Sequence, residues 1–243
     1  RDSKEEPRFD EKPRVRTPPR VDPTSTRRKR SADAKAAREP AGATTSSHGA
    51  YVLIESPTYA KGMYELRKRG DVAFNFKDNL RARLEQPDLY DTWLDSATAI
   101  AYKKDSSKIK IIHACEWLRN IPAHFKSAYI DVSYDELVGI ELDTAKGKWN
   151  QSLTKAHIME HPGWLALVEE DKALLREYRD TTFAKYVRTY GEIDALMAFW
   201  TEEKPTVNQL RAVFVYLLNF SSIADGSVDL SDVGRFLRRS PRS

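Results

Sequence analysis

The chain has 243 residues, of which 40% are hydrophobic, so it can bury a sizeable core, while its single cysteine excludes an internal disulfide. No apolar run approaches the roughly 20 residues that a membrane-spanning helix needs. The net charge of +4 is unevenly distributed: residues 1–48 hold 13 Lys and Arg against 8 Asp and Glu, whereas residues 127–232 hold 10 against 18. The excess of negative charge in the second half argues against a broad nucleic-acid groove there.

Residues 1–48 are predicted to be a disordered basic arm and linker, because their only large apolar side chains are Phe9, Val15 and Val21. A cationic run stands within this arm. It consists of Arg27, Arg28, Lys29 and Arg30. The run fits a nuclear localisation signal, a protease cleavage site or a solvated segment without a partner. It also fits an arm that becomes ordered when it binds a polyanion or an acidic neighbouring subunit. We favour the last, because each Lys or Arg that reaches a phosphate releases a counterion and binds without reading sequence.

Residues 49–128 are predicted to form a mildly basic helical subdomain. Residues 51–56 fit a short strand or an apolar lead-in, and residues 56–70 read as a helix that Ser56 caps and Gly70 ends. Apolar spacing of three and four residues predicts two further helices, over 89–104 and 107–120.

Two basic clusters in this half are predicted to support phosphate binding by the arm, although solvated side chains explain them equally well. The clusters are Arg67, Lys68 and Arg69, and Lys103 with Lys104.

Residues 129–243 are predicted to form an acidic helical subdomain. Helices are expected over 131–142, 161–191, 192–199 and 205–221, the longest of them ending at Gly191. The predicted fold class is therefore mostly α, with irregular helical domains behind a long disordered basic arm.

Catalytic motifs are weak. The stretch HIMEH resembles the inverted zinc-protease pattern, which would make His157 and His161 zinc ligands and Glu160 the base, but Pro162 biases His161 away from helical geometry. Cys115 lies on an apolar stripe and is predicted to be a core residue. With no glycine-rich phosphate loop, nucleophile elbow or cysteine cluster, no enzyme activity is predicted.

The C-terminal stretch 205–239 resembles a degenerate EF-hand, a helix–loop–helix module. With the loop aligned as residues 221–232, Gly226 takes the sixth position, where the family turns sharply. Ser221 and Ile223 stand where the family has acids, so the resemblance implies weak Ca²⁺ binding and no other cofactor. The ligands it implies are Ser221, Asp225, Asp229 and Asp232.

We therefore predict a non-catalytic structural subunit of a large assembly of the ribonucleoprotein or nucleocapsid type. Its partners would be other protein subunits and the backbone of RNA or DNA, bound without sequence specificity. Its expected location is intracellular, with organellar, nuclear and virion sites left open. The alternative is an EF-hand-like protein-binding adaptor, either constitutive or weakly responsive to calcium.

Overall fold

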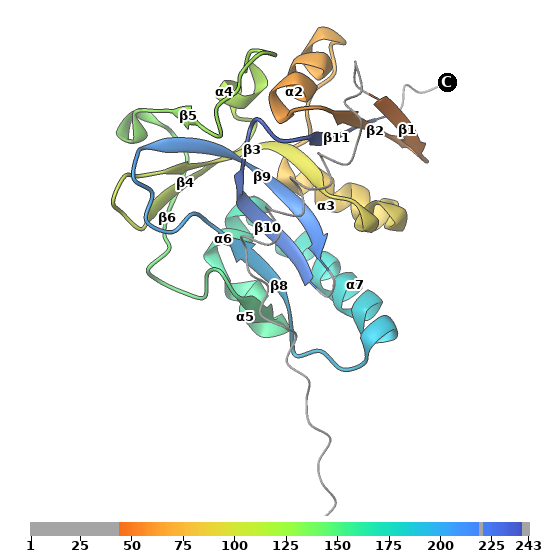
Figure 1. Ribbon diagram of the computed structural model, residues 1–243. Coiled ribbons are helices and arrows are strands. Elements are labelled where there is room, and N and C mark those ends of the chain that lie inside the picture. The colour runs from red at the N-terminus through yellow and green to blue at the C-terminus, as the bar shows by residue number, and fades with distance from the viewer. Residues whose placement is uncertain (1–43, 219–220, 240–243) are drawn as a thin grey trace, which may run out of the picture.

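The computed structural model describes residues 44–218 and 221–239, and it overturns the prediction of a mostly α fold. Eleven strands within those ranges form two sheets, with helices packed around them (Figure 1). Most of the predicted arm, including Arg27 to Arg30, lies outside the described residues. Its last part, Thr44–His48, forms strand β1 rather than a disordered linker.

The smaller sheet is antiparallel and joins the two ends of the described chain, in the order β1-β2-β11. Its strands are β1 (Thr44–His48), β2 (Tyr51–Ser56) and β11 (Gly234–Arg239). The main sheet has eight strands in the order β6-β4-β3-β9-β10-β8-β7, and β5 pairs with β9 off this path. Its strands are β3 (Leu94–Tyr102), β4 (Lys108–Ile112), β5 (Ile130–Asp131), β6 (Ile140–Asp143), β7 (Ser152–Thr154), β8 (Ala195–Trp200), β9 (Gln209–Leu218) and β10 (Ser221–Val228). Strands from 49–128 and from 129–243 thus pair within one sheet.

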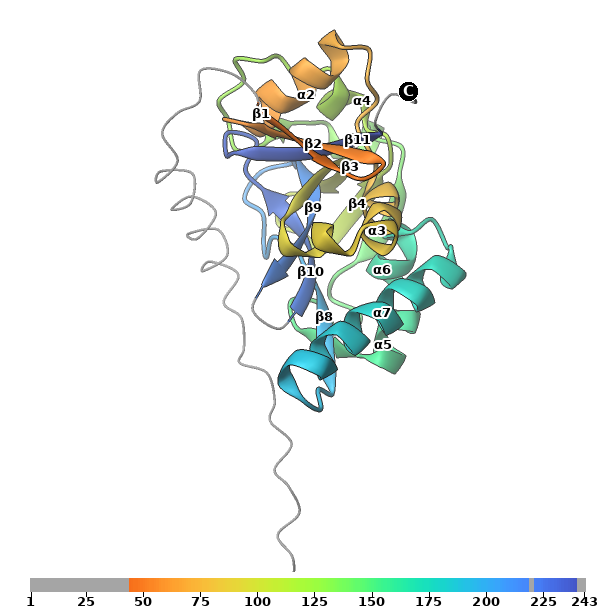
Figure 2. The same cartoon turned by 90° about the vertical axis from the view of Figure 1, so that its right-hand side faces the viewer.

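The helices divide into two groups. The first covers one face of the main sheet and contains α3 (Phe76–Glu85), α5 (Lys155–Glu160), α6 (Pro162–Leu167) and α7 (Lys172–Tyr190). The second lies beside the small sheet and contains α2 (Tyr59–Lys68) and α4 (Glu116–Arg119). Figure 2 shows both groups from the side. Two 3₁₀ turns, η1 (Pro87–Asp91) and η2 (Tyr134–Glu136), complete the set.

The core follows the alternation of side chains along the strands. In β9, Val213 and Val215 face the helix layer, and Ala212 and Phe214 pack with the cluster on the other face. Trp164 of α6 is fully buried in the larger cluster, with its ring 5.8 Å from that of Phe76. No helix within the described ranges has both the length and the apolar character needed to cross a bilayer.

Several local predictions are confirmed. Residues 51–56 are a strand, and α2 lies within the predicted 56–70, although Thr58 rather than Ser56 caps it by accepting from the Lys61 N–H at 3.0 Å. Helix α7 ends where Gly191 takes a φ of +83°. The predicted helix 161–191 is nevertheless divided into α6 and α7 by Glu169 and Glu170, which have φ values of 54° and 60°.

Five other predicted helices are wrong, and three of them fall on strands of the main sheet that are buried on both faces, β3, β8 and β9. Residues 89–104 form η1 and β3, and every residue of β3 is buried. Residues 107–120 form β4 and α4, and 131–142 form η2 and part of β6. The remaining two became β8 and β9. A strand buried on both faces carries apolar residues at nearly every position, so helical spacing can be found in it by chance.

The EF-hand prediction is also wrong. Residues 221–228 are strand β10, and the segment that was expected to be the exiting helix is strand β11. Gly226 serves packing rather than a turn, because a Cβ there would collide with the side chain of Ile100 and lie 2.9 Å from the Tyr102 hydroxyl.

Candidate polyanion-binding cleft

Two adjoining cavities lie among the end of α2, segment 71–75, α3, α4 and the end of β11, and we call them together the basic cleft. The first, about 230 Å³ in volume, is lined by Met63, Leu66, Arg67, Asp71 and Asn120. The second, about 350 Å³, is lined by Tyr51, Phe74, Asn75, Asp78, Arg81 and Arg239. Val72, Ala73 and Arg119 line both. These shared residues make the two cavities parts of one cleft.

Helix α2 places Arg67 at the cleft. The last turn of α2 carries Arg67 and Lys68, which the negative end of a helix dipole favours. Gly70, with a φ of +73° and open space around its Cα, then turns the chain into segment 71–75. An Arg67 guanidinium N–H donates to the Arg119 carbonyl oxygen at 2.7 Å. This bond holds α4 and its arginine beside α2.

Pairing of β11 with β2 brings Arg239 to the cleft. Arg239 stands opposite Tyr51 in the strand register, and its guanidinium carbon is 5.8 Å from the Tyr51 ring centre. The Tyr51 hydroxyl donates to the Glu85 carboxylate. Burial, and then this carboxylate, raise the pKa of Tyr51 to about 12, so its hydroxyl stays protonated beside Arg239.

Three of the four arginines of the cleft have no acidic partner among the residues that the structure describes. Within the described ranges, no carboxylate lies within ion-pair distance of Arg67, Arg119 or Arg239. The Nε of Arg119 is buried without a hydrogen-bond partner there. Asp71 and Asp78 also line the cleft, but they pair with Arg238 and Arg81, so these three arginines remain uncompensated among the described residues and can attract an anion.

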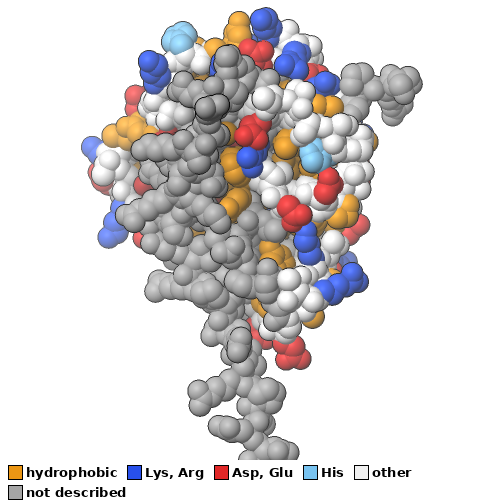
Figure 3. Space-filling model, turned by 45° about the vertical axis from the view of Figure 1, so that its right-hand side comes forward, with side chains coloured by type: hydrophobic (Ala, Val, Ile, Leu, Met, Phe, Trp, Pro, Cys, Tyr) orange, Lys and Arg blue, Asp and Glu red, His pale blue; other side chains and the backbone are white. Residues whose placement is uncertain are grey.

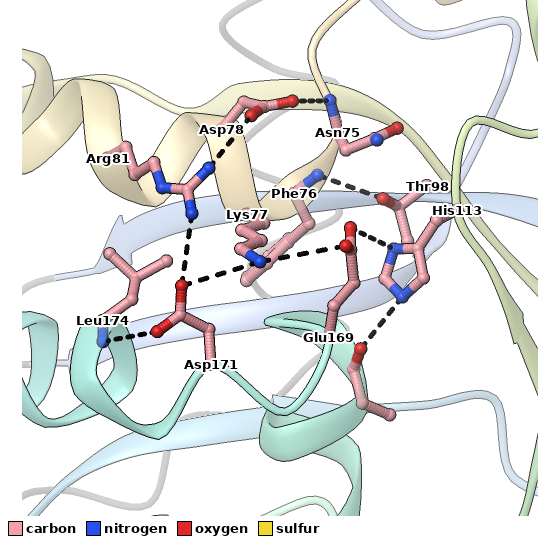
Figure 4. Close-up of polar contacts among 11 residues, drawn as sticks. Asn75, Phe76, Lys77, Asp78, Arg81, Thr98, His113, Glu169, Asp171 and Leu174 are labelled. Atoms are coloured by element: carbon pink, nitrogen blue, oxygen red, sulfur yellow. Dashed lines mark hydrogen bonds and ion pairs between the residues drawn. The ribbon is translucent and has the colours of Figure 1, made fainter.

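The fourth arginine, Arg81, is held by a network of charges (Figure 4). It lies 3.2 Å from Asp171 and 3.9 Å from Asp78, and Lys77 lies 3.6 Å from Asp171 and 3.8 Å from Glu169. The Leu174 N–H, followed by the two cations, holds the pKa of Asp171 below its usual range. The network therefore clamps α3 to the turn between α6 and α7 and compensates much of the Arg81 charge.

His113 completes this network at its inner edge. Its Nε2 lies 2.9 Å from the Ala166 carbonyl oxygen, and its Nδ1 lies 3.8 Å from the Glu169 carboxylate (Figure 4). Burial lowers the pKa of His113 in spite of this carboxylate. A neutral imidazole that donates to a carbonyl suits a structural link between β4 and α6.

The structure separates the residues that sequence reasoning grouped as basic clusters. Arg67 lines the cleft, and Lys68 and Arg69 are exposed at the end of the same helix. Lys103 and Lys104 follow β3 instead, next to η2, where Lys103 pairs with Asp135 at 2.8 Å. The face in Figure 3 agrees with this dispersal, since its coloured Lys and Arg side chains are interspersed with acidic and apolar ones.

The residues proposed as metal ligands do not form a loop. Ser221 and Asp225 belong to β10, and Asp229 and Asp232 stand between β10 and β11. The Asp225 carboxylate accepts from the Ser227 N–H at 2.8 Å, which shapes the chain locally. Nowhere in the described part of the chain do three or more His, Cys, Asp or Glu side chains gather as a metal site.

The zinc-protease pattern has no geometric support. His161 is buried and caps α6, its Nδ1 accepting from the Trp164 N–H at 3.3 Å, and its backbone ψ of 117° confirms that Pro162 draws it out of helical geometry. His157 lies against Thr154 and Lys148 instead.

Sequence reasoning missed Arg119 and Arg239 as site residues. Arg119 was placed in the helix predicted over 107–120, and Arg239 in the exiting helix of the EF-hand. Only the pairing of β11 with β2 and the packing of α4 on α2 bring them together. The excess of arginine near the C-terminus was the one signal in the sequence.

Comparisons with known proteins give a fold and no family. No protein-family model matches the chain, and no curated protein matches it by sequence. Among solved structures, it is similar to a chain described as "Accommodation of massive sequence variation in Nanoarchaeota by the C-type lectin fold". The TM-score is 0.58 at 14% identity, and the match covers 81% of this chain and 98% of the other. The likeness supports a C-type lectin fold and further excludes the EF-hand interpretation.

Proposed function

We propose that the protein is a non-catalytic subunit of a nucleic-acid-containing assembly, and that it binds the phosphate backbone in the basic cleft. The observation that carries the proposal is the convergence of Arg67, Arg119 and Arg239 on one cleft, none of them paired with a described carboxylate. Guanidinium groups match phosphate oxygens in geometry as well as in charge.

The chemistry of the cleft suits binding rather than catalysis. Its acids are Asp71 and Asp78, and both contact cations: Asp71 lies 3.5 Å from Arg238, and Asp78 lies 3.9 Å from Arg81. No histidine, cysteine or serine lines either cavity. Backbone recognition by three arginines would be strongly salt-dependent and blind to sequence, as in other phosphate-contacting surfaces.

The fold likeness is compatible with this role. The similar solved chain is described as a C-type lectin fold that accommodates massive sequence variation, and a scaffold of that kind can change its surface without losing its core. We further propose an intracellular location and other protein subunits as partners, on the basis of the single cysteine and of the acidic segment 127–232.

The test is the salt dependence of nucleic-acid binding by the full chain, measured by fluorescence anisotropy. Three phosphate contacts predict a slope of about −2 to −3 in log K against log salt. The triple variant Arg67→Gln, Arg119→Gln, Arg239→Gln should reduce the slope by about that amount, because each arginine lost removes one released counterion.

The matched control removes the same charge elsewhere. Lys172, Arg176 and Arg188 are exposed on α7, and their triple substitution by Gln should leave the slope nearly unchanged. Equal losses in the two triple variants would mean that only net charge matters, and the cleft proposal would then be wrong. A third variant, with Gln at 27–30, measures separately what the arm contributes.

A further inference from the structure

The two halves of the basic cleft differ in chemistry. Four apolar side chains, those of Met63, Leu66, Val72 and Ala73, line the first cavity, with arginine at its edges. The second cavity shares Val72, Ala73 and Arg119 with the first, and it adds Arg81 and Arg239 together with Tyr51, Phe74 and Asp78. Met63 and Leu66 line only the first cavity, which we call the apolar half, and Arg81 and Arg239 line only the second, the cationic half. The apolar half points to a ligand that carries an apolar surface beside its anionic group.

Helix α2 and the turn after it build the apolar half. Met63 and Leu66, three residues apart, are both on the buried face of α2. Val72, which follows the turn, is 66% exposed and stands where the two cavities meet. A valine that is this exposed and lines both cavities is available for contact with a ligand.

Arg67 and Arg119 flank this apolar half and are joined by the bond from the Arg67 guanidinium to the Arg119 carbonyl oxygen. A guanidinium plane can stack on a nucleobase as well as contact a phosphate. Asn120, in the same cavity, offers an amide that can both donate to and accept from a base edge.

We infer that the basic cleft takes single-stranded nucleic acid, with one unstacked base in the apolar half and its phosphate in the cationic half. This inference rests on the function proposed above. Arg119 lines both halves, so a base and the adjoining phosphate can be bound at the same time. A duplex cannot offer such a base, because its bases are paired and stacked inside the helix.

The experiment compares three probes on the full chain at one salt concentration. They are a labelled oligo(dT) of about 15 nucleotides, the matching duplex, and inorganic polyphosphate as a competitor without bases. Oligo(dT) should bind at least about tenfold more tightly than the duplex, since base stacking adds to phosphate contact. Polyphosphate should compete in a salt-dependent manner.

Two variants test the apolar half without changing charge. Val72→Asn removes the apolar contact at an exposed position, and Ala73→Leu fills the cavity. Each should weaken oligo(dT) binding by about tenfold and leave polyphosphate binding within about twofold. The matched control is Val187→Asn, at a valine of α7 that is 44% exposed. Thermal melting verifies that each variant is folded. If Ala73→Leu does not fold, Val72→Asn alone still tests the inference.

The outcomes separate the two proposals. If polyphosphate and oligo(dT) bind and the arginine triple variant weakens both, but the duplex binds as tightly as oligo(dT) or Val72→Asn has no effect, the single-strand inference is wrong and backbone binding stands. If the arginine triple variant binds every probe as well as the native chain does, backbone binding in the cleft is itself wrong.

Discussion

His161 should make the stability of the fold depend on pH between 6.5 and about 4. It is 3% exposed, and its ring centre lies 4.6 Å from that of Trp149 and 6.1 Å from that of Phe199. Its Nδ1 accepts from the Trp164 N–H, a role that the neutral ring fulfils. Burial lowers the pKa of His161 from 6.5 to about 4.

The sign follows from which state binds the proton. Between pH 6.5 and 4 the unfolded chain protonates this histidine and the folded chain does not. The contribution of His161 to the free energy of unfolding is therefore fully present above pH 6.5. Below that pH, the free energy of unfolding falls by about 1.4 kcal/mol per pH unit. The total loss would be about 3 kcal/mol by pH 4, as an order of magnitude.

The substitution His161→Asn isolates this contribution. Asparagine is also a good N-cap, so the cap on α6 is kept while the titrating group is removed. At pH 7.5 the variant should be less stable by about 2 kcal/mol, because the space between Trp149 and Phe199 is no longer filled. That difference should shrink on acidification and approach zero or reverse near pH 4.5.

Urea unfolding followed by tryptophan fluorescence, at pH values from 7.5 to 4.5, measures both proteins. Carboxylates that titrate in the same range affect both equally and cancel in the difference. The same substitution at His124, which is exposed, is the control and should follow the native chain at every pH. A constant difference between the native chain and His161→Asn over the whole range would refute the reasoning.

Two substitutions and one labelling experiment test the packing. Arg83→Met should cost about 3 kcal/mol in urea unfolding, because the buried guanidinium donates to the Tyr178 hydroxyl at 3.0 Å and to two carbonyl oxygens that would lose their partner. Gly163→Ala should cost about 2 kcal/mol in the same assay, because a Cβ there would collide with the Phe199 ring, and unchanged stability would contradict that packing. Cys115 is buried, and burial raises the pKa of its thiol, so it should react with a thiol reagent only when denaturant is added.

How far the sequence predicts this fold depends on whether a signal is local. The cap and stop of α2, the end of α7 at Gly191 and the break at Pro162 depend on a few neighbouring residues, and those predictions were right or nearly so. The central strands depend on what packs on their two faces. In β3, all nine residues are buried, so LDSATAIAY does not alternate by two, and its Leu94, Ala97 and Ile100 follow a helical spacing by chance.

A polar residue in strand β10 led to the wrong prediction of a calcium-binding loop. Asp225 suggested a calcium ligand, yet it lies in β10 beside Trp200 of β8, and its carboxylate accepts from Ser227. The glycine that followed it suggested a loop, yet it makes room for Ile100. For the glycine the cause is strand β3, which is far away in the sequence, so no short motif could reveal it.

The count of charges in a segment, unlike apolar spacing, does not depend on how that segment folds. Segment 49–126 has a positive balance and the last residues are rich in arginine. The antiparallel pairing of β11 with β2 brings these two segments together. Arg235 pairs there with Glu55 and Arg238 with Asp71, whereas Arg239 lines the cleft. The basic cleft therefore forms where two segments with an excess of positive charge meet, and its Arg81 is paired there with Asp171 of the acidic second half.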